Sequence, residues 1–250
     1  MRALILSDIH SNLEALTAVM AAAPEHDCVW NLGDVVGYGA NPNEVIDRAR
    51  QFGNVFVRGN HDRACCGLSD LEDFNPIAGR AARWTRAVLT EEHTHWLRQM
   101  AAGPIHPDGP AVSCVHGSLL DEDQYVLTVR DAWQPLCQAE TRLNFFGHTH
   151  VQGGFATNGH EWFRLTPQYG SRDRGECYQL VLRDGARYLL NPGSVGQPRD
   201  GDWRAAFAIY DDAEGIVMFY RVPYDVRLAQ MRILGAGLPD RLATRLREGR

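Results

Sequence analysis

Long apolar runs and fibrous repeats are both missing from this chain of 250 residues. No stretch of about eighteen apolar residues occurs, so the sequence predicts no membrane-spanning helix. Neither a glycine period nor a sustained heptad is present, which excludes collagen-like and coiled-coil architectures. Because 44% of the residues are hydrophobic and 22% are charged, the chain can bury enough surface to fold as an ordinary globular protein.

Cysteine motifs and a recognisable targeting segment are missing as well. The six cysteines form no C-x-x-C pair and show no zinc-finger spacing, which argues against a structural zinc bound by thiolates. Only four apolar residues, 3–6, lie between Arg2 and Ser7, too few for the core of a signal peptide. We therefore expect a cytoplasmic protein whose thiols are reduced.

An excess of positive charge is also lacking. The 25 Lys and Arg residues face 31 Asp and Glu residues, which leaves a net charge of −6 at pH 7 with histidine neutral. Non-specific binding to nucleic acid draws its affinity from many cationic contacts to phosphates. A net-acidic chain is therefore a poor candidate for that activity.

The periodicity of apolar residues predicts an α/β fold. In the first half, strands are expected at 3–6, 28–30 and 54–57, and helices at 12–23, 43–52, 77–89 and 90–100. In the second half, strands are expected at 111–115, 144–146, 178–182, 187–190, 205–210 and 216–221, before a helix at 225–234 and a charged tail. Strand–helix alternation implies a sheet covered on both faces. The short connections of the second half imply that part of this half is antiparallel. We expect one domain over residues 1–250, with two stacked sheets and outer helices.

The informative polar residues each follow a predicted strand. They are five histidines, two aspartates and one asparagine: Asp8, His10, Asp34, Asn60, His61, His116, His148 and His150. In open α/β sheets, ligands bind in the crevice at the carboxyl ends of the strands. These strand ends therefore deliver metal-competent side chains to one rim.

The spacing of these residues suits metal binding. Residues i and i+2 of an extended chain point to the same side, so Asp8 with His10 and His148 with His150 can each form a clip. Eight oxygen and nitrogen ligands suit two ions, and mixed imidazole–carboxylate ligation suits transition metals. We expect two divalent metal ions, manganese first, with iron, zinc, cobalt or nickel as alternatives. Two such ions with two carboxylates keep a positive surplus that attracts phosphate and acidifies a bridging water.

The ordered set of motifs resembles the calcineurin-like metallophosphoesterases. The motifs are Asp8-Ile9-His10, Gly33-Asp34-Val35-Val36-Gly37, Gly59-Asn60-His61-Asp62, His116-Gly117 and Gly147-His148-Thr149-His150. Asn191-Pro192-Gly193-Ser194 is similar to a further segment of the small bacterial and archaeal phosphodiesterase branch. The resemblance implies a four-layer α/β/β/α sandwich of two mixed sheets with outer helices, and a di-metal site at the C-terminal ends of the strands.

The resemblance also implies a role for each residue. One metal would be held by Asp8, His10, Asp34 and His150. The second metal would be held by Asn60, His116 and His148, with Asp34 bridging both ions. His61 would protonate the leaving oxygen or stabilise the transition state, and a bridging hydroxide would be the nucleophile.

The chain departs at one motif from the protein Ser/Thr phosphatases of this superfamily. Those enzymes have Gly-Asp-x-x-Asp-Arg-Gly, in which the second Asp orients the catalytic histidine and the Arg clamps phosphate. Gly37 and Tyr38 stand at these two positions, which argues against that class and leaves the partner of His61 open. Asp62 is one candidate, although neighbours along a chain often point apart. Arg63 either supplies the missing cation or is a solvated loop residue.

Further contacts to substrate stay open at this point. Tyr38 lies in a loop that flanks the metals, where it can contact substrate. Asn12 either bonds a phosphate or caps the helix that begins there. Residues 119–127, which contain three acids, either rim the pocket or form a solvated loop. Residues 157–177 include a polar, aromatic stretch that is either a hairpin or a substrate loop.

We predict a metal-dependent phosphoesterase that acts on a phosphorylated small molecule or nucleotide, with a mild preference for diesters over monoesters. The enzymatic alternatives are a dinucleoside-polyphosphate hydrolase and a protein phosphatase. The non-enzymatic alternative is a metal-containing protein-binding module, against which the complete set of ligands and His61 argues. A nuclease is less favoured, because no basic stripe interleaved with aromatic residues occurs.

Overall fold

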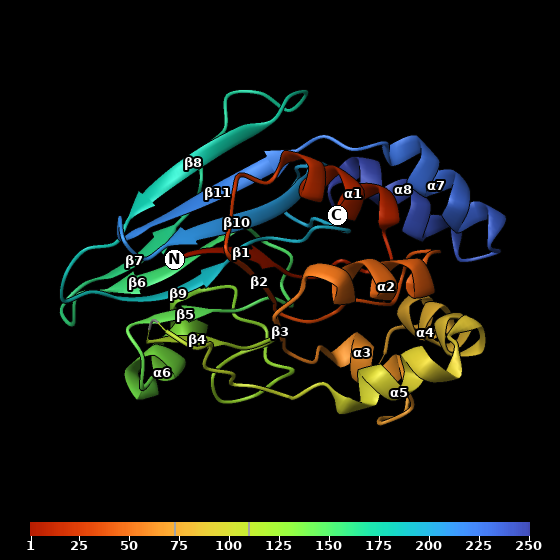
Figure 1. Ribbon diagram of the computed structural model, residues 1–250, viewed down its shortest axis with the longest axis horizontal. Helices are drawn as coiled ribbons and strands as arrows, with labels where there is room; N and C mark the ends of the chain where they lie inside the picture. The colour runs from red at the N-terminus through yellow and green to blue at the C-terminus, as the bar shows by residue number, and fades with distance from the viewer. Residues whose placement is uncertain (73, 110) are drawn as a thin grey trace.

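Two β-sheets form the middle of the molecule in the computed structural model, which describes residues 1–72, 74–109 and 111–250 (Figure 1). The first sheet has six strands in the order β3-β2-β1-β10-β11-β8. The pairs β3–β2 and β2–β1 are parallel, and the remaining pairs are antiparallel. The strand bounds are β1 Arg2–Leu6, β2 Cys28–Asn31, β3 Val55–Phe56, β8 Glu176–Val181, β10 Ala205–Asp211 and β11 Ile216–Val222.

The second sheet has five strands in the order β4-β5-β9-β6-β7. The pairs β4–β5 and β5–β9 are parallel, whereas β6 pairs antiparallel with both β9 and β7. The strand bounds are β4 Val112–Cys114, β5 Leu143–Phe145, β6 Gly153–Thr157, β7 Trp162–Leu165 and β9 Arg187–Asn191. Both sheets are therefore mixed, as the sequence predicts.

Helices cover the outer face of each sheet. In the described part of the chain, seven helices share a hydrophobic cluster with the first sheet: α1 Leu13–Ala22, α2 Pro42–Phe52, α3 Asn60–Cys65, α4 Pro76–Val88, α5 Glu91–Gln99, α7 Val226–Gly235 and α8 Asp240–Glu248. Helix α6, Val129–Gln138, packs instead on the second sheet. Figure 1 shows α6 apart from the other helices, at the opposite end of the view.

Strand β1 explains why the molecule has four layers. Leu4 and Leu6 belong to the cluster shared with the helices, whereas Ala3 and Ile5 belong to the cluster between the two sheets. All four side chains are fully buried. Because successive side chains of a strand point to opposite faces, a strand buried on both sides needs a layer on each face. The four-layer α/β/β/α sandwich is thereby confirmed.

Local capping bonds explain where two helices begin. Asn12 Oδ1 accepts a hydrogen bond of 3.1 Å from the backbone N–H of Ala15, at the start of α1. Thr90 Oγ1 accepts a bond of 3.1 Å from the N–H of His93, at the start of α5. Side-chain oxygens at these positions satisfy N–H groups that have no partner within the helix. Asn12 is therefore a helix cap in this structure.

Four elements, β6, β7, α6 and α8, lie where the sequence analysis predicted none. Residues 162–165 form β7, which pairs with β6, so the stretch 157–177 begins as a hairpin. The charged tail forms α8, and residues 129–138 form α6. Thr128 and Asp131 cap α6 by bonding to each other's backbone N–H groups, and this capping box was a signal in the sequence. Short helix α3 was also not predicted, although it carries Asn60 and His61.

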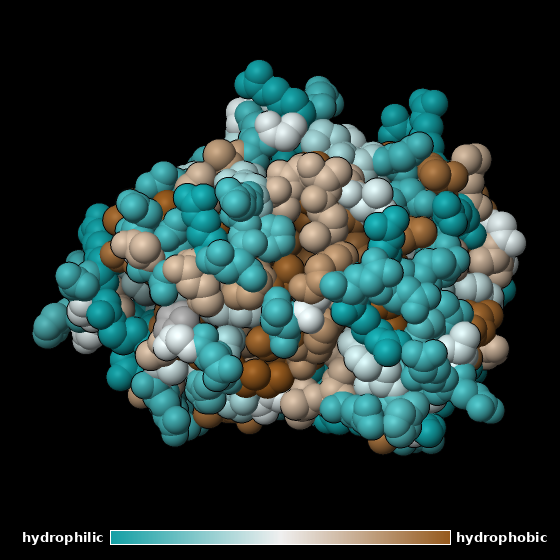
Figure 2. All heavy atoms as spheres, viewed as in Figure 1, coloured by the Kyte–Doolittle hydropathy of each residue, from teal (hydrophilic) through white to brown (hydrophobic). Residues whose placement is uncertain are grey.

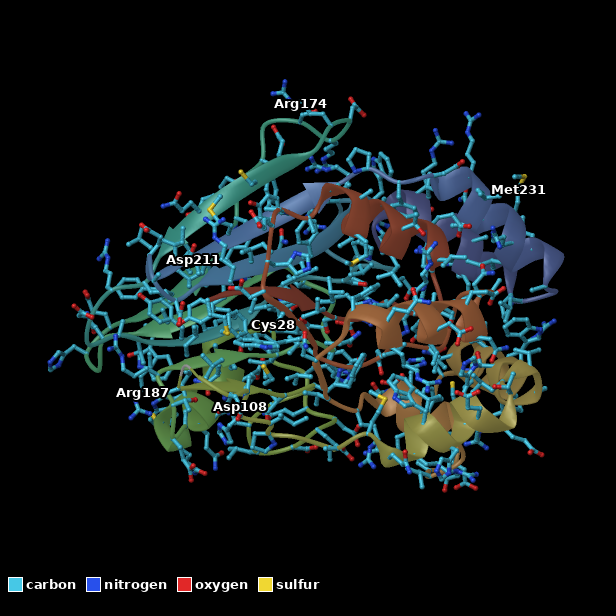
Figure 3. The ribbon with its side chains drawn as sticks, in the orientation of Figure 1. Cys28, Asp108, Arg174, Arg187, Asp211 and Met231 are labelled. Atoms are coloured by element: carbon cyan, nitrogen blue, oxygen red, sulfur yellow. The ribbon has the colours of Figure 1, made fainter. Side chains whose placement is uncertain are left out.

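The surface is mostly hydrophilic on the face shown in Figure 2, with hydrophobic residues reaching it mainly near the middle of the view. Met231, 62% exposed, projects from α7, as Figure 3 shows. Within the residues that the structure describes, every helix is too short or too polar to span a bilayer.

Candidate metal centre

The strand ends bring the predicted ligands together. Asp8 and His10 follow β1, Asp34 follows β2, and His116 follows β4. His148 and His150 follow β5, while Asn60 and His61 open α3 just after β3. Two groups of ligand atoms lie within 4.8 Å of one another: Asp8, His10, Asp34 and His150, and Asp34, His116 and His148. Asp34 belongs to both groups, and the residues of both groups are buried.

The backbone of these loops is unusual. In the described chain, the non-glycine residues with φ between 49° and 64° are Asp8, His10, Ser11, Asp34, Tyr38, His148 and His150. L-residues rarely adopt this left-handed region, and strained backbone of this kind concentrates at functional sites. Gly33, with φ of +100°, supplies the turn before Asp34, where an added Cβ would lie 2.7 Å from the backbone nitrogen of Gly59.

Hydrogen bonds orient the imidazoles of the first group. His10 Nδ1 donates to the carbonyl of Val36 at 3.0 Å, and His150 Nδ1 donates to the carbonyl of Gln197 at 2.6 Å. A carbonyl only accepts, so each Nδ1 carries the hydrogen and each neutral ring has a lone pair on Nε2. These two Nε2 atoms face each other at 3.1 Å. Facing lone pairs repel, and a cation between them removes the repulsion.

Hydrogen bonds orient the imidazoles of the second group in the same way. His116 Nδ1 donates to the carbonyl of Leu32 at 2.8 Å, and His148 Nε2 donates to the carbonyl of Asp123 at 3.1 Å. The other nitrogens, His116 Nε2 and His148 Nδ1, face each other at 3.2 Å. Asn60 Oδ1 also lies 3.2 Å from His116 Nε2. Three acceptor atoms thus converge with no donor among them when the rings are neutral.

The Asp34 carboxylate joins the two groups electrostatically. Its Oδ2 lies 3.5 Å from His10 Nε2 and 3.5 Å from His116 Nε2. Burial alone would raise the pKa of Asp34, but His116 and its neighbours hold it well below the ordinary value. Burial alone would lower the pKa of His116, but the Asp34 and Asp8 carboxylates raise it to about 9. The negative potential that favours a proton at His116 favours a metal cation equally.

A carboxylate oxygen of Asp8 also indicates a cation at this position. Asp8 Oδ2 is buried and has no hydrogen-bond partner among the described residues. A buried ionised oxygen without a partner is costly unless a cation reaches it. Oxygen and imidazole nitrogen donors are the ligands that divalent transition metals use. The donor set therefore fits two divalent cations that share Asp34.

His61 lies beside the two groups rather than within them. Its ring centroid is 4.8 Å from that of His10 and 4.3 Å from that of Tyr38. Burial lowers the pKa of His61 to about 4, although the Asp34 carboxylate opposes that shift. Nδ1 of His61 is buried with no hydrogen-bond partner in the described chain. Gly37 makes room for this ring, because an added Cβ would lie 2.5 Å from Nδ1.

Asp62 is not the partner of His61 in this structure. Its two carboxylate oxygens accept hydrogen bonds from the backbone N–H groups of Val36, at 3.1 Å, and Gly59, at 3.0 Å. Asp62 therefore ties the loop after β2 to the start of α3. Burial, with the nearby Asp34 charge, raises the pKa of Asp62 to about 7.

Arg63 turns toward the loop 119–127. Its guanidinium pairs with Glu122 and, at 2.7 Å, with Asp123. Arg58 adds a second pair to Glu122 at 3.3 Å. Two of the three acids of this loop, Glu122 and Asp123, are thus engaged in ion pairs with Arg58 and Arg63. The same loop carries Tyr125, whose ring centroid lies 4.0 Å from that of His148.

Asn12 and Tyr38 have different surroundings. Both ends of the Asn12 amide are engaged, since Oδ1 caps α1 and Nδ2 donates to the carbonyl of Gly196 at 2.9 Å. Tyr38 is 6% exposed and lies between the metal ligands and two guanidinium groups. Of the two, only Tyr38 has its polar group beside an arginine, since its hydroxyl lies 3.3 Å from Arg199 Nη2.

Sequence reasoning missed the two arginines around Tyr38. Arg199 Nη2 lies 3.3 Å from Tyr38 Oη, and Arg245 on α8 lies 4.5 Å above the Tyr38 ring. Arg245 also donates to Gln197 Oε1, and its buried Nε has no partner among the described residues. Burial lowers the pKa of Arg245 to about 10. Arg199 follows the Asn191–Ser194 segment closely, which was a signal, whereas nothing in the tail marked Arg245.

The chain is similar to known proteins over most of its length. The family model described as "Calcineurin-like phosphoesterase superfamily domain" matches residues 1–214. "Uncharacterized protein MJ0912" of Methanocaldococcus jannaschii is 34% identical, over 98% of this chain and 97% of its own length. The crystal structure of a metallophosphoesterase from Sphaerobacter thermophilus is 38% identical with a TM-score of 0.82, and the match covers 100% of this chain and 99% of that one.

A more distant match carries the name of an activity. The Yersinia enterocolitica protein named "Bis(5'-nucleosyl)-tetraphosphatase, symmetrical" is 29% identical over 38% of this chain, and the match covers 34% of that protein. The family model, the full-length match to the Sphaerobacter thermophilus metallophosphoesterase and the two His/Asp groups together support a phosphoesterase with a binuclear divalent metal site. This chain therefore belongs to the calcineurin-like phosphoesterase superfamily.

Proposed function

We propose that the chain, as one domain over residues 1–250, hydrolyses a phosphodiester with two divalent metal ions, manganese first. The observation that carries the proposal is the Asp34 carboxylate, shared by two groups of ligands in which imidazole nitrogens face each other at 3.1 Å and 3.2 Å. Binuclear sites of this kind serve in-line displacement at phosphorus.

The residues would divide between the metals as the family resemblance implies. One ion would be held by Asp8, His10, Asp34 and His150, and the other by Asp34, Asn60, His116 and His148. When bound, such ions acidify water and stabilise charge on phosphoryl oxygens. The chain contributes rigidity, because the carbonyls of Leu32, Val36 and Gln197 fix the ring orientations.

His61 would act at the leaving oxygen or at the transferring phosphoryl group. With the pKa of His61 lowered to about 4 by burial, its neutral form dominates near pH 7. A neutral imidazole still donates one N–H, which stabilises charge that develops in the transition state. We propose this role over transfer of a full proton from the imidazolium.

Arg199 and Arg245 would hold the phosphate oxygens. Their guanidinium carbons lie 5.8 Å and 4.5 Å from the centroid of the Tyr38 ring. They thus supply cations beside the position where the protein Ser/Thr phosphatases carry an arginine and this chain carries Tyr38. Arginine suits this task because its planar donors match two phosphate oxygens at once.

The test is hydrolysis of bis-p-nitrophenyl phosphate by protein stripped with a chelator, with and without added Mn²⁺. We expect turnover only with metal, and slower turnover of the monoester p-nitrophenyl phosphate. Equal or faster monoester turnover would remove the diester preference. Metal binding without hydrolysis of any ester, after trials with other divalent ions, would favour the protein-binding module instead.

A second candidate function is hydrolysis within a dinucleoside polyphosphate. The distant match to a protein named as a symmetrical bis(5'-nucleosyl)-tetraphosphatase favours it. Chromatography of the products from diadenosine tetraphosphate separates the two candidates, because cleavage at the centre releases two molecules of ADP. Release of phosphate from a phosphoprotein would instead point to a protein phosphatase.

A further inference from the structure

A cavity of about 520 Å³ lies beside the metal centre. One wall is the second sheet around Phe155, and the loop after β7 lines it with Thr166 to Arg172. Figure 3 shows the continuation of this loop, with Arg174 projecting from it just before β8. The volume falls in the range of small-molecule sites, which is about 300–1,000 Å³.

Two lining residues connect the cavity to the metal centre. Thr149 lies between His148 and His150 in the sequence and lines the cavity. Arg199 lines it too, while its backbone N–H donates to the carbonyl of His150 at 3.1 Å. The Arg199 guanidinium contacts Tyr38 at 3.3 Å, as described above. The cavity therefore adjoins the position at which the metal centre would bind a phosphate.

The lining carries a positive surplus in a net-acidic chain. Five arginines and two aspartates line the cavity, a surplus of three positive charges, whereas the whole chain has a net charge of −6. Arg204 pairs with Asp202, and Arg221 pairs with Asp200. In the described chain, no carboxylate pairs with Arg164, Arg172 or Arg199, so these three leave their charge available to an anion.

The cavity floor is built from interlocked side chains. Tyr169 lies between Arg204 and Arg221, with guanidinium carbons at 5.4 Å and 5.9 Å from its ring centroid. Its hydroxyl donates to Gln152 Oε1 at 2.6 Å, and Arg221 Nε donates to the same oxygen at 3.0 Å. A floor fixed by so many contacts is preorganised, which lowers the entropic cost of binding a ligand.

We propose that this cavity binds a nucleoside phosphate portion of the substrate, an inference that rests on the proposed function. Val126, Leu127 and Phe155 supply an apolar wall for the flat base. Arg164 and Arg172 would attract the negative charge of the nucleoside phosphate. Guanidinium planes also stack on bases. An inorganic phosphate would leave most of the volume and the whole apolar wall without a contact.

The experiment is calorimetric titration of the full-length, metal-loaded protein with adenosine 5′-monophosphate, ribose 5-phosphate, adenosine and inorganic phosphate. The proposal expects adenosine 5′-monophosphate to bind most tightly. The variants Arg164→Glu and Arg172→Glu each weaken it by about tenfold, a loss typical of one charged contact, while phosphate affinity changes less than about twofold. Both positions are exposed, so the variants should fold.

A matched control is Arg183→Glu, which alters an exposed arginine outside the cavity lining and should leave all four affinities unchanged. Equal affinity for ribose 5-phosphate and adenosine 5′-monophosphate would show that the base makes no contact with the cavity and would overturn the proposal of a nucleoside site. Unchanged nucleotide affinity in both cavity variants would overturn the site itself. These outcomes are independent of turnover, so absence of ester hydrolysis in the wild type would count against the proposed function alone.

Discussion

The proposed metal ligands and the two arginines beside Tyr38 lie close together but are positioned by different means. Each ligand lies within a few residues of a strand end, and left-handed backbone at residues such as Asp34 and His148 aims the side chain. Arg245 reaches Tyr38 from α8, which packs on α7 and joins the hydrophobic core of the helix side through Leu242 and Leu246. The position of each proposed ligand is thus set within a short motif, whereas the position of Arg245 depends on how a helix distant in sequence packs.

The largest loss of activity is expected from a change to the proposed metal ligands. Asp34→Asn removes the charge shared by both groups of ligands, so we expect loss of bound metal and a fall in diester turnover of more than about 10³-fold, since metal ions contribute several kcal/mol to such transition states. Metal content by mass spectrometry and turnover with Mn²⁺ are the measurements. Asp108→Asn, an exposed aspartate labelled in Figure 3, is the matched control. Wild-type turnover in Asp34→Asn would remove the shared-carboxylate arrangement.

The next effect separates chemistry from metal binding. His61→Ala should lower turnover by about 10²–10⁴-fold, the usual loss for a group that donates a proton or a hydrogen bond in the transition state. Metal content should not change, because His61 lies outside both groups of ligands. His95→Ala, which removes an exposed histidine on α5, should behave as wild type. Metal loss in His61→Ala would assign that side chain to the ligands.

The same contrast explains how much the sequence could reveal. The residues of the two ligand groups could be found from the sequence, because short motifs after apolar strands keep their meaning without knowledge of the packing. Arg63 shows the limit, since its pairing with Glu122 depends on a loop some sixty residues away. The β6–β7 hairpin was missed because β6 begins with two glycines and the middle of β7 is exposed, so neither shows the alternation of a strand. Helix α8 did carry a signal, because Leu242 and Leu246 recur at helical spacing and are buried.

A smaller effect tests the distant part of the site. Arg199→Gln removes a guanidinium that contacts Tyr38 and faces the cavity, so we expect KM for the diester to rise by about 10–100-fold, typical of one hydrogen bond to a charged group. Arg199→Lys keeps the charge but not the fork of donors and should recover part of the loss. A fall in kcat with KM unchanged would place Arg199 at the transition state rather than in substrate binding.

The smallest effect concerns Arg245, whose position depends on α8. The Arg245 guanidinium lies over Tyr38 and bonds Gln197, so part of its influence passes through these two side chains. We expect Arg245→Gln to raise KM by about three- to tenfold, in line with a cation–π contact near a surface. Arg247→Gln, an exposed position on the same helix, controls for changes in helix stability. If both variants raised KM equally, the effect would come from the docking of α8 and not from the charge over Tyr38. An effect of Arg245→Gln alone, with an unchanged melting temperature, would show that the distant helix completes the phosphate site.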